Sequence, residues 1–153
     1  MALLQISEPG QSQEPHQKKF YIGIDLGTTN SLVALIQNGS TTLLKDKNNS
    51  ELFPSIVTYT KNSVSIGDDY EKNQSITFRS IKRLIGKNIN DIDKSSFYSP
   101  CEYIGDDSVV KFNVFEKLLT PIEISSEILK YLKKVTEETM LGEIEGCVIT
   151  VPA

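Results

Sequence analysis

The sequence has no excess of positive charge, a single histidine and only two cysteines. Its 16 Lys and Arg residues are outnumbered by 20 Asp and Glu residues, which gives a net charge of -4 and excludes a basic nucleic-acid clamp. The one histidine, His16, excludes a Ser-His-Asp triad, a Cys-His pair and a zinc site built from several histidines. Cys101 and Cys147 lie outside any C-x-x-C pattern, so we expect both to be reduced and at least partly buried.

Long apolar runs are missing as well. No segment approaches the roughly 20 apolar residues that a membrane-spanning helix needs, which argues against a membrane partner. The N-terminus is apolar for only a few residues and lacks a positively charged leading segment, so it does not resemble a secretory signal and we expect a cytoplasmic protein. With 39% hydrophobic and 24% charged residues in a chain of 153, the composition is that of a globular domain.

The first third of the chain predicts a flexible tail followed by an antiparallel meander. Residues 1–19 show neither helical nor strand periodicity. Residues 21–25 and 31–37 predict two strands, and the apolar residues of the second fall on both of its faces, so we expect it to be covered on both sides. Asn38-Gly39 is typical of a type I′ hairpin turn leading into a third strand at 40–45.

The last third predicts a helix and a strand. Thr120, Pro121 and Glu123 combine an N-cap, a proline in the first helical position and the acidic residue of a capping box. A helix then continues to Gly142, and residues 146–151 predict a buried strand. The order strand, helix, strand favours a parallel crossover, so the fold class is α/β or α+β with a mixed sheet.

The middle of the chain is less regular, and the chain ends close to a predicted core strand. We expect strands at 56–60, 64–67 and 109–115 and a helix from Asp68. Because the sequence stops at Ala153 with nothing to cover the last strand, we expect it to be the first part of a longer chain.

Residues 23–31 contain the sharpest local pattern, a strand that ends in Asp25 and a turn of small residues. Gly27 would let the backbone approach an anion closely, and the amides and hydroxyls of Thr28 and Thr29 would donate to phosphate oxygens. Asp25 would face Mg²⁺, which prefers few carboxylates together with phosphate and water. The alternative is a hairpin rich in turn-forming residues. Neither G-x-x-x-x-G-K-S/T nor G-x-G-x-x-G is present, so the sequence offers neither a P-loop nor a Rossmann motif as another phosphate-binding site.

Four segments of the sequence resemble one family. Residues 22–31 (IGIDLGTTNS) are similar to the first phosphate loop of the actin-like ATPases and, in this form, of the DnaK-type seventy-kilodalton heat-shock chaperones. Residues 53–57 (FPSIV), 81–86 (IKRLIG) and 148–153 (VITVPA) agree with the same family in order and spacing. The resemblance implies lobe I of an actin-like, ribonuclease H-like ATPase domain, truncated, without the second lobe or the peptide-binding domain.

The resemblance also implies a division of the chain. Residues 20–52 and 120–153 would form the core subdomain, and residues 53–119 would form a small inserted subdomain that contains Lys82. ATP or ADP and Mg²⁺ would be the cofactors, held by the phosphate-loop residues Gly27, Thr28, Thr29 and Asn30 and, through water, by Asp25.

Three further residues receive roles from the family. Lys82 matches the catalytic lysine, whereas taken alone it would be a solvated lysine beside Arg83. Arg83 and Pro152 match residues thought to relay the nucleotide state to the peptide-binding domain. Without the resemblance, Arg83 would be a surface charge and Pro152 a strand terminator.

Residues 1–10 resemble the branch of the family that serves iron–sulfur cluster assembly. That branch implies an ATP-driven chaperone whose partners are a J-domain co-chaperone and an iron–sulfur scaffold protein. Two alternatives stay open. The chain could be a truncated, non-enzymatic module that is inert or competes for chaperone partners, or it could be a relative of actin-like filaments or sugar kinases, which share only the first loop.

Overall fold

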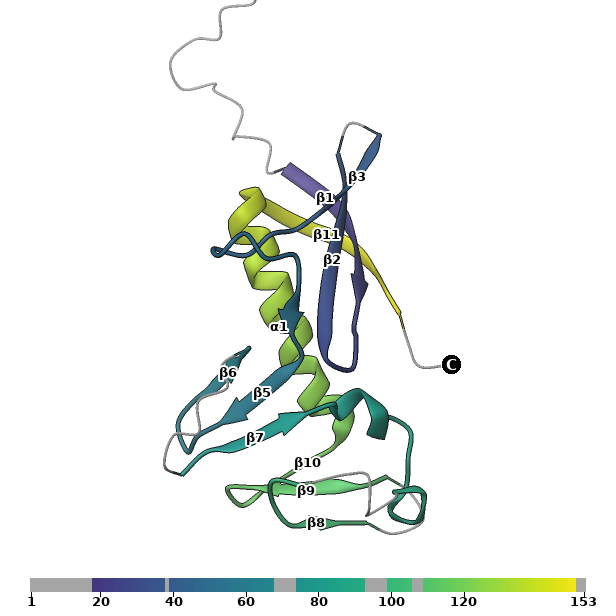
Figure 1. The fold of residues 1–153 in the computed structure, drawn as a ribbon, viewed down its shortest axis with the longest axis vertical. Coiled ribbons are helices and arrows are strands. Elements are labelled where there is room, and N and C mark those ends of the chain that lie inside the picture. The colour runs from purple at the N-terminus through teal and green to yellow at the C-terminus, as the bar shows by residue number, and fades with distance from the viewer. Residues whose placement is uncertain (1–17, 38, 68–73, 93–98, 106–108, 151–153) are drawn as a thin grey trace, which may run out of the picture.

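The structure is a computed structural model, and it describes residues 18–37, 39–67, 74–92, 99–105 and 109–150 (Figure 1). The predictions for the helix from Asp68 and for Pro152 therefore concern residues outside the described ranges, as does the predicted tail up to residue 17. Lys18 and Lys19, which were expected to belong to the tail, instead begin the first strand. Within those ranges, no helix is long and apolar enough to cross a membrane.

The largest sheet has five strands in the order β11-β1-β2-β3, with β4 also paired to β2. β1 is antiparallel to β2, and β2 is antiparallel to β3, which confirms the predicted meander. β11 is parallel to β1, which confirms the crossover. The strands of this sheet are β1 (Lys18–Asp25), β2 (Asn30–Gln37), β3 (Ser40–Leu43), β4 (Phe53–Pro54) and β11 (Gly142–Ile149).

Helix α1 (Pro121–Met140) provides the crossover, and its N-terminus is capped as predicted. The Thr120 side chain accepts a hydrogen bond from the Glu123 amide, and the Glu123 carboxylate accepts one from the Thr120 amide. The helix ends at Leu141, whose left-handed backbone (φ 51°) reverses the chain directly into β11. β11 therefore begins at Gly142, earlier than the predicted residue 146, because no loop separates it from the helix.

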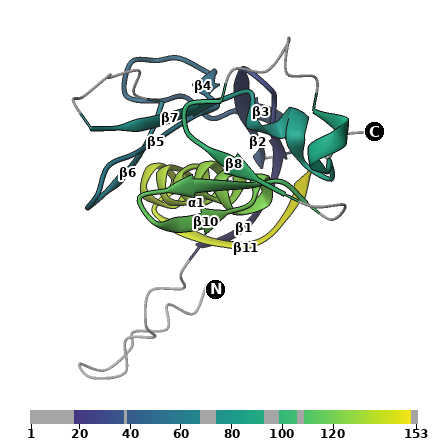
Figure 2. The ribbon, with the colours of Figure 1, turned by 90° about the horizontal axis from the view of Figure 1, so that it is seen from below.

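Two smaller sheets are built from the middle of the chain. One has the order β6-β5-β7 and the other the order β10-β9-β8, so the predicted strands near 56–60, 64–67 and 109–115 are present. Figures 1 and 2 show α1 running between the main sheet and the β6-β5-β7 sheet, and it contacts both. The elements are β5 (Ile56–Tyr59), β6 (Val64–Ile66), β7 (Ile76–Arg79), η1 (Ile81–Leu84), η2 (Ile89–Asp91), β8 (Tyr103–Ile104), β9 (Lys111–Val114) and β10 (Lys117–Leu119).

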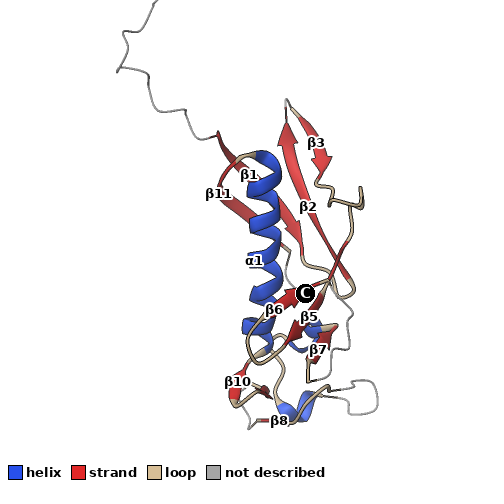
Figure 3. Cartoon of the chain, turned by 90° about the vertical axis from the view of Figure 1, so that its left-hand side faces the viewer, coloured by secondary structure: helices blue, strands red, loops and turns tan. Residues whose placement is uncertain are grey.

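Helix α1 runs alongside the strands of the main sheet (Figure 3), and residues of its buried face belong to the hydrophobic core. Ile124, Ile128 and Leu132 are at most 1% exposed and form the buried face of the helix. Where the helix meets the small sheets, Phe78 and Phe112 pack edge to face with ring centroids 5.0 Å apart. This aromatic contact joins β7 to β9, so one continuous core holds the three sheets to the helix.

The second face of the main sheet is open, which corrects the expectations that the strand at 31–37 is covered on both sides and that the strand at 146–151 is buried. Val33 and Leu35 are buried toward α1, but Ile36 is 74% exposed. Tyr21 and Val148, on the neighbouring strands, are 65% and 77% exposed. The reason is that α1 covers one face only and none of the described elements covers the other.

Candidate functional site

The turn between β1 and β2 is shaped by Gly27. The Gly27 amide donates to the Asp25 carbonyl over 3.1 Å, which folds the backbone back on itself. A Cβ atom at this position would lie 1.9 Å from the Asn30 carbonyl oxygen, much closer than any real contact. Only glycine therefore permits this turn, which places Thr28 and Thr29 at its tip.

The tip of the turn has free backbone donors. The amides of Thr28 and Thr29 make no hydrogen bond to any residue that the structure describes. The Thr29 carbonyl, by contrast, accepts a bond of 2.8 Å from the Ser55 amide, which holds the turn against the start of β5. Successive unpaired amides on a fixed turn form a concave set of donors that suits an anion such as a phosphate.

Asp25 ends β1 at the base of the same turn. Its Oδ1 atom accepts a hydrogen bond of 2.6 Å from the Thr150 hydroxyl. Its other oxygen has no partner among the described residues, and the side chain is exposed. Within those residues, no group of three or more His, Cys, Asp or Glu could hold a metal by itself. One carboxylate beside phosphate donors fits Mg²⁺, which keeps most of its waters and takes few protein ligands.

Lys82 lies in the short helix η1, directly after β7. Ile81 and Leu84 on either side of it are 1% and 3% exposed and fix the helix in the core, while Lys82 is half-buried. Pairing of β7 with β5 places Arg79 opposite Ile56, one residue after the Ser55 that bonds the turn.

Figures 1 and 3 show that the short helix η1, which follows β7, lies near the turn between β1 and β2. No hydrogen bond or ion pair of the Lys82 side chain is found in the described part of the chain. Arg83, the next residue, is exposed. Pro152 lies outside the described residues. The five predicted phosphate and metal residues lie together at the end of β1 and in the turn that follows it: Asp25, Gly27, Thr28, Thr29 and Asn30. Lys82 and Arg83 lie on the separate short helix η1.

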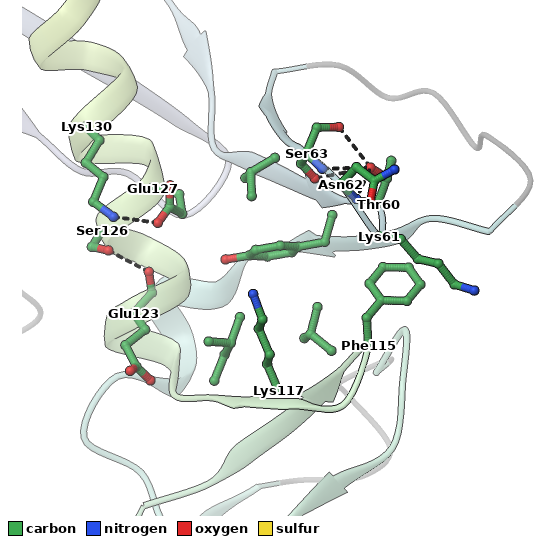
Figure 4. Close-up of a pocket in the computed structure, with 14 residues that line it drawn as sticks. Thr60, Lys61, Asn62, Ser63, Phe115, Lys117, Glu123, Ser126, Glu127 and Lys130 are labelled. Atoms are coloured by element: carbon green, nitrogen blue, oxygen red, sulfur yellow. Dashed lines mark hydrogen bonds and ion pairs between the residues drawn. The ribbon is translucent and has the colours of Figure 1, made fainter.

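A separate cavity of about 560 Å³ lies between α1, the β5–β6 turn and β10 (Figure 4). None of the predicted site residues lines it. Lys130 on its helical wall lies 2.6 Å from Glu127. Burial, together with the charges of Glu127 and Glu123, raises the pKa of the Tyr59 phenol to about 12. The lining of the cavity thus includes one ion pair and a tyrosine whose raised pKa keeps it neutral at physiological pH.

Two contributions to the site were missed by the sequence reasoning. Thr150 is 125 residues from the Asp25 that it bonds, and Ser55 is 26 residues from Thr29. No local pattern connects residues so far apart, and only the strand pairing of the folded chain brings them together. Both cysteines are free, as expected, and Cys101 is half-buried, but Cys147 is exposed, which corrects the expectation that both are at least partly buried.

Comparison with known proteins identifies the family. The family model described as Hsp70 protein matches residues 21–153. The chain is similar over its whole length to the proteins named "Chaperone protein HscA homolog" of Pseudoalteromonas atlantica (44% identical), Methylobacillus flagellatus (46%) and Histophilus somni (45%). It spans about a quarter of the length of these relatives, 25%, 25% and 26% respectively. This chain, with its mixed α/β fold, belongs to the Hsp70 family.

Proposed function

We propose that this chain is part of an ATP-dependent chaperone that binds and hydrolyses ATP to drive clamping and release of a client protein. The observation that carries the proposal is the similarity over the whole chain to relatives named as HscA chaperones. The glycine-dependent turn with unpaired amides supports it independently. Because the chain spans only a quarter of those relatives, hydrolysis and client binding are proposed for a whole protein of their length, and residues 1–153 alone are expected to be inactive.

The fold proposed for the chain is lobe I of an actin-like ATPase domain. In this proposal residues 20–52 and 120–153 form the core subdomain and residues 53–119 form the inserted small subdomain. The distribution of strands supports the division, since β1–β3 and β11 share the main sheet and β5–β10 form the two small ones, with β4 at the boundary paired to β2.

The turn at Gly27 is proposed to bind the phosphates of ATP or ADP. The amides and hydroxyls of Thr28 and Thr29 donate to phosphate oxygens, and the Asn30 side chain adds a further donor. Asp25 holds Mg²⁺ through water. When bound, that ion supplies positive charge that neutralises the phosphate oxygens.

Lys82 is proposed as the catalytic residue. Its ammonium group stabilises the negative charge that develops on the γ-phosphate oxygens as water attacks, and losing such a donor costs about 3 to 4 kcal/mol of activation free energy. A half-buried lysine on a helix anchored in the core, with no ion-pair partner in the described chain, is suited to this role. Arg83 and Pro152 are proposed to relay the nucleotide state to a peptide-binding domain.

The proposed pathway is iron–sulfur cluster assembly in the cytoplasm. The similarity to relatives named HscA and the resemblance of residues 1–10 support it. The proposed partners are a J-domain co-chaperone and an iron–sulfur scaffold protein. Nucleic acid is not a proposed partner, since the net charge is -4.

Gly27 provides the test of nucleotide binding. Gly27→Ala should abolish Mg²⁺-dependent ATP binding, because the new methyl group collides with the Asn30 carbonyl. Titration calorimetry on the protein purified from its own cells measures this binding. Gly23→Ala is the matched control, since its Cβ would meet only the Ala34 side chain, at an ordinary 3.8 Å. Equal ATP affinity in both variants, or no ATP binding by the unchanged protein, would contradict the proposed function.

A further inference from the structure

The end of β11 is tied to the end of β1 by two hydrogen bonds from one residue. The Thr150 amide donates to the Ile24 carbonyl over 3.0 Å, continuing the parallel pairing of the two strands. The Thr150 hydroxyl donates to Oδ1 of Asp25 over 2.6 Å. Backbone pairing therefore sets the position of Thr150, and the hydroxyl reaches from that fixed position to the carboxylate.

The hydroxyl bond acts on the orientation of a side chain that is otherwise free to rotate. Asp25 is exposed, and in the described chain its carboxylate has no other hydrogen-bond partner and no ion pair. A short bond between a hydroxyl and a carboxylate is among the stronger hydrogen bonds in proteins. With Oδ1 held by Thr150, the second oxygen has no hydrogen-bond partner in the described chain and remains available to a ligand.

We propose that Thr150 is a positioning residue for Mg²⁺: its hydroxyl orients the Asp25 carboxylate toward the hydrated ion beside the phosphates. The inference rests on the proposed function of the Gly27 turn and extends it to a residue at the opposite end of the chain. Partners that orient a ligand in this way typically contribute about 10-fold or more to metal affinity.

A purely structural role for Thr150 gives a different expectation. Its amide bond to Ile24 involves the backbone and persists when the side chain changes. Thr150 is exposed, so its methyl group adds little buried apolar surface. Thr150→Val keeps the shape and the strand propensity and removes only the hydroxyl, whereas Thr150→Ser keeps the hydroxyl and removes only the methyl group.

The experiment uses the protein purified from its own cells. Titration calorimetry measures its affinity for ADP, once in EDTA and once over a range of Mg²⁺ concentrations. The ratio of the two affinities is the gain due to Mg²⁺. Thr150→Val should lower this gain about 10-fold and raise the half-saturating Mg²⁺ concentration by a similar factor, with ADP affinity in EDTA unchanged within about twofold. Thr150→Ser should restore the gain.

Thr42→Val is the matched control, because Thr42 is an exposed strand threonine with no side-chain hydrogen bond in the described chain. It should leave both affinities unchanged. The proposed role of Thr150 is overturned if Thr150→Val keeps the full gain in ADP affinity due to Mg²⁺, or if it loses ADP affinity equally with Mg²⁺ and in EDTA. Either result would leave the proposed function standing. If the unchanged protein binds ADP without any gain from Mg²⁺, both this inference and the proposed function are contradicted.

Discussion

The hydroxyl oxygens of Ser31 and Ser55 lie 2.9 Å apart, and both residues are buried, at 0% and 3% exposure. Ser31 belongs to β2, directly after the candidate phosphate turn, and Ser55 lies between β4 and β5. The Ser55 amide also bonds the Thr29 carbonyl. Ser55 therefore fixes the turn to the small β6-β5-β7 sheet with its backbone and its side chain at once.

The first prediction concerns this buried pair. Ser55→Ala should lower the free energy of unfolding by about 1 to 3 kcal/mol, because it leaves the Ser31 hydroxyl buried without a partner. Urea unfolding measures the change, and Ser40→Ala, in an exposed strand position, is the control at no more than about 0.5 kcal/mol. The double variant Ser31→Ala with Ser55→Ala should lose less than the sum of the single variants; strict additivity would show that the hydroxyls do not interact.

The second prediction uses two isoleucines of α1. Ile128 is 1% exposed and Ile122 is 59% exposed. Ile128→Ala should reduce the free energy of unfolding by about 2 to 5 kcal/mol, since it leaves a cavity between the helix and the sheets. Ile122→Ala should change it by no more than about 0.5 kcal/mol. Similar losses in both variants would contradict the face of α1 that the structure assigns to the core.

The third prediction concerns the N-terminus of α1. Thr120→Ala should lower the free energy of unfolding by about 0.5 to 2 kcal/mol, because the Glu123 amide loses its acceptor. Thr120→Ser keeps the hydroxyl and should retain most of the stability. A Thr120→Ser variant as unstable as Thr120→Ala would mean that the cap does not stabilise the helix.

The fourth prediction is a pH dependence from the same cap. Hydrogen bonds from the amide and then the hydroxyl of Thr120 lower the pKa of Glu123 below its usual 4.5. Folding thus favours the charged carboxylate, so its contribution is fully present above pH 4.5 and is lost as the pH falls through the lowered pKa of the folded state. The stability difference between the unchanged protein and Glu123→Gln, measured by urea unfolding, should therefore shrink below pH 4.5. A difference that grows as the pH falls would contradict this sign.

Local sequence signals predicted the elements whose geometry is decided locally. The prediction that Thr120 caps the helix is confirmed, because a cap residue bonds backbone groups within three positions of itself. The meander and the parallel return of β11 follow from apolar patterns and from the order of elements. The turn at Gly27 was recognisable from its pattern, a strand that ends in Asp25 followed by a glycine and small hydroxyl residues.

Contacts between distant residues could not be predicted in the same way. An apolar residue such as Ile36 does not reveal whether anything covers it, and the open sheet face was therefore missed. The start of β11 was misplaced because the left-handed Leu141 removes the loop that was expected there. The bonds of Asp25 to Thr150 and of Ser31 to Ser55 depend on strand register, which the sequence does not state.

The central claim, ATP hydrolysis with Lys82 as the catalytic residue, is tested most directly by Lys82→Ala in the protein purified from its own cells. The control is Lys87→Ala, which changes an exposed lysine five residues away. ATP affinity and single-turnover hydrolysis are measured on both variants. We expect Lys82→Ala to bind ATP with unchanged affinity and to hydrolyse it about 100- to 1,000-fold more slowly, because the developing charge on the γ-phosphate loses its ammonium partner. Hydrolysis by Lys82→Ala at the rate of Lys87→Ala would contradict the catalytic role of Lys82.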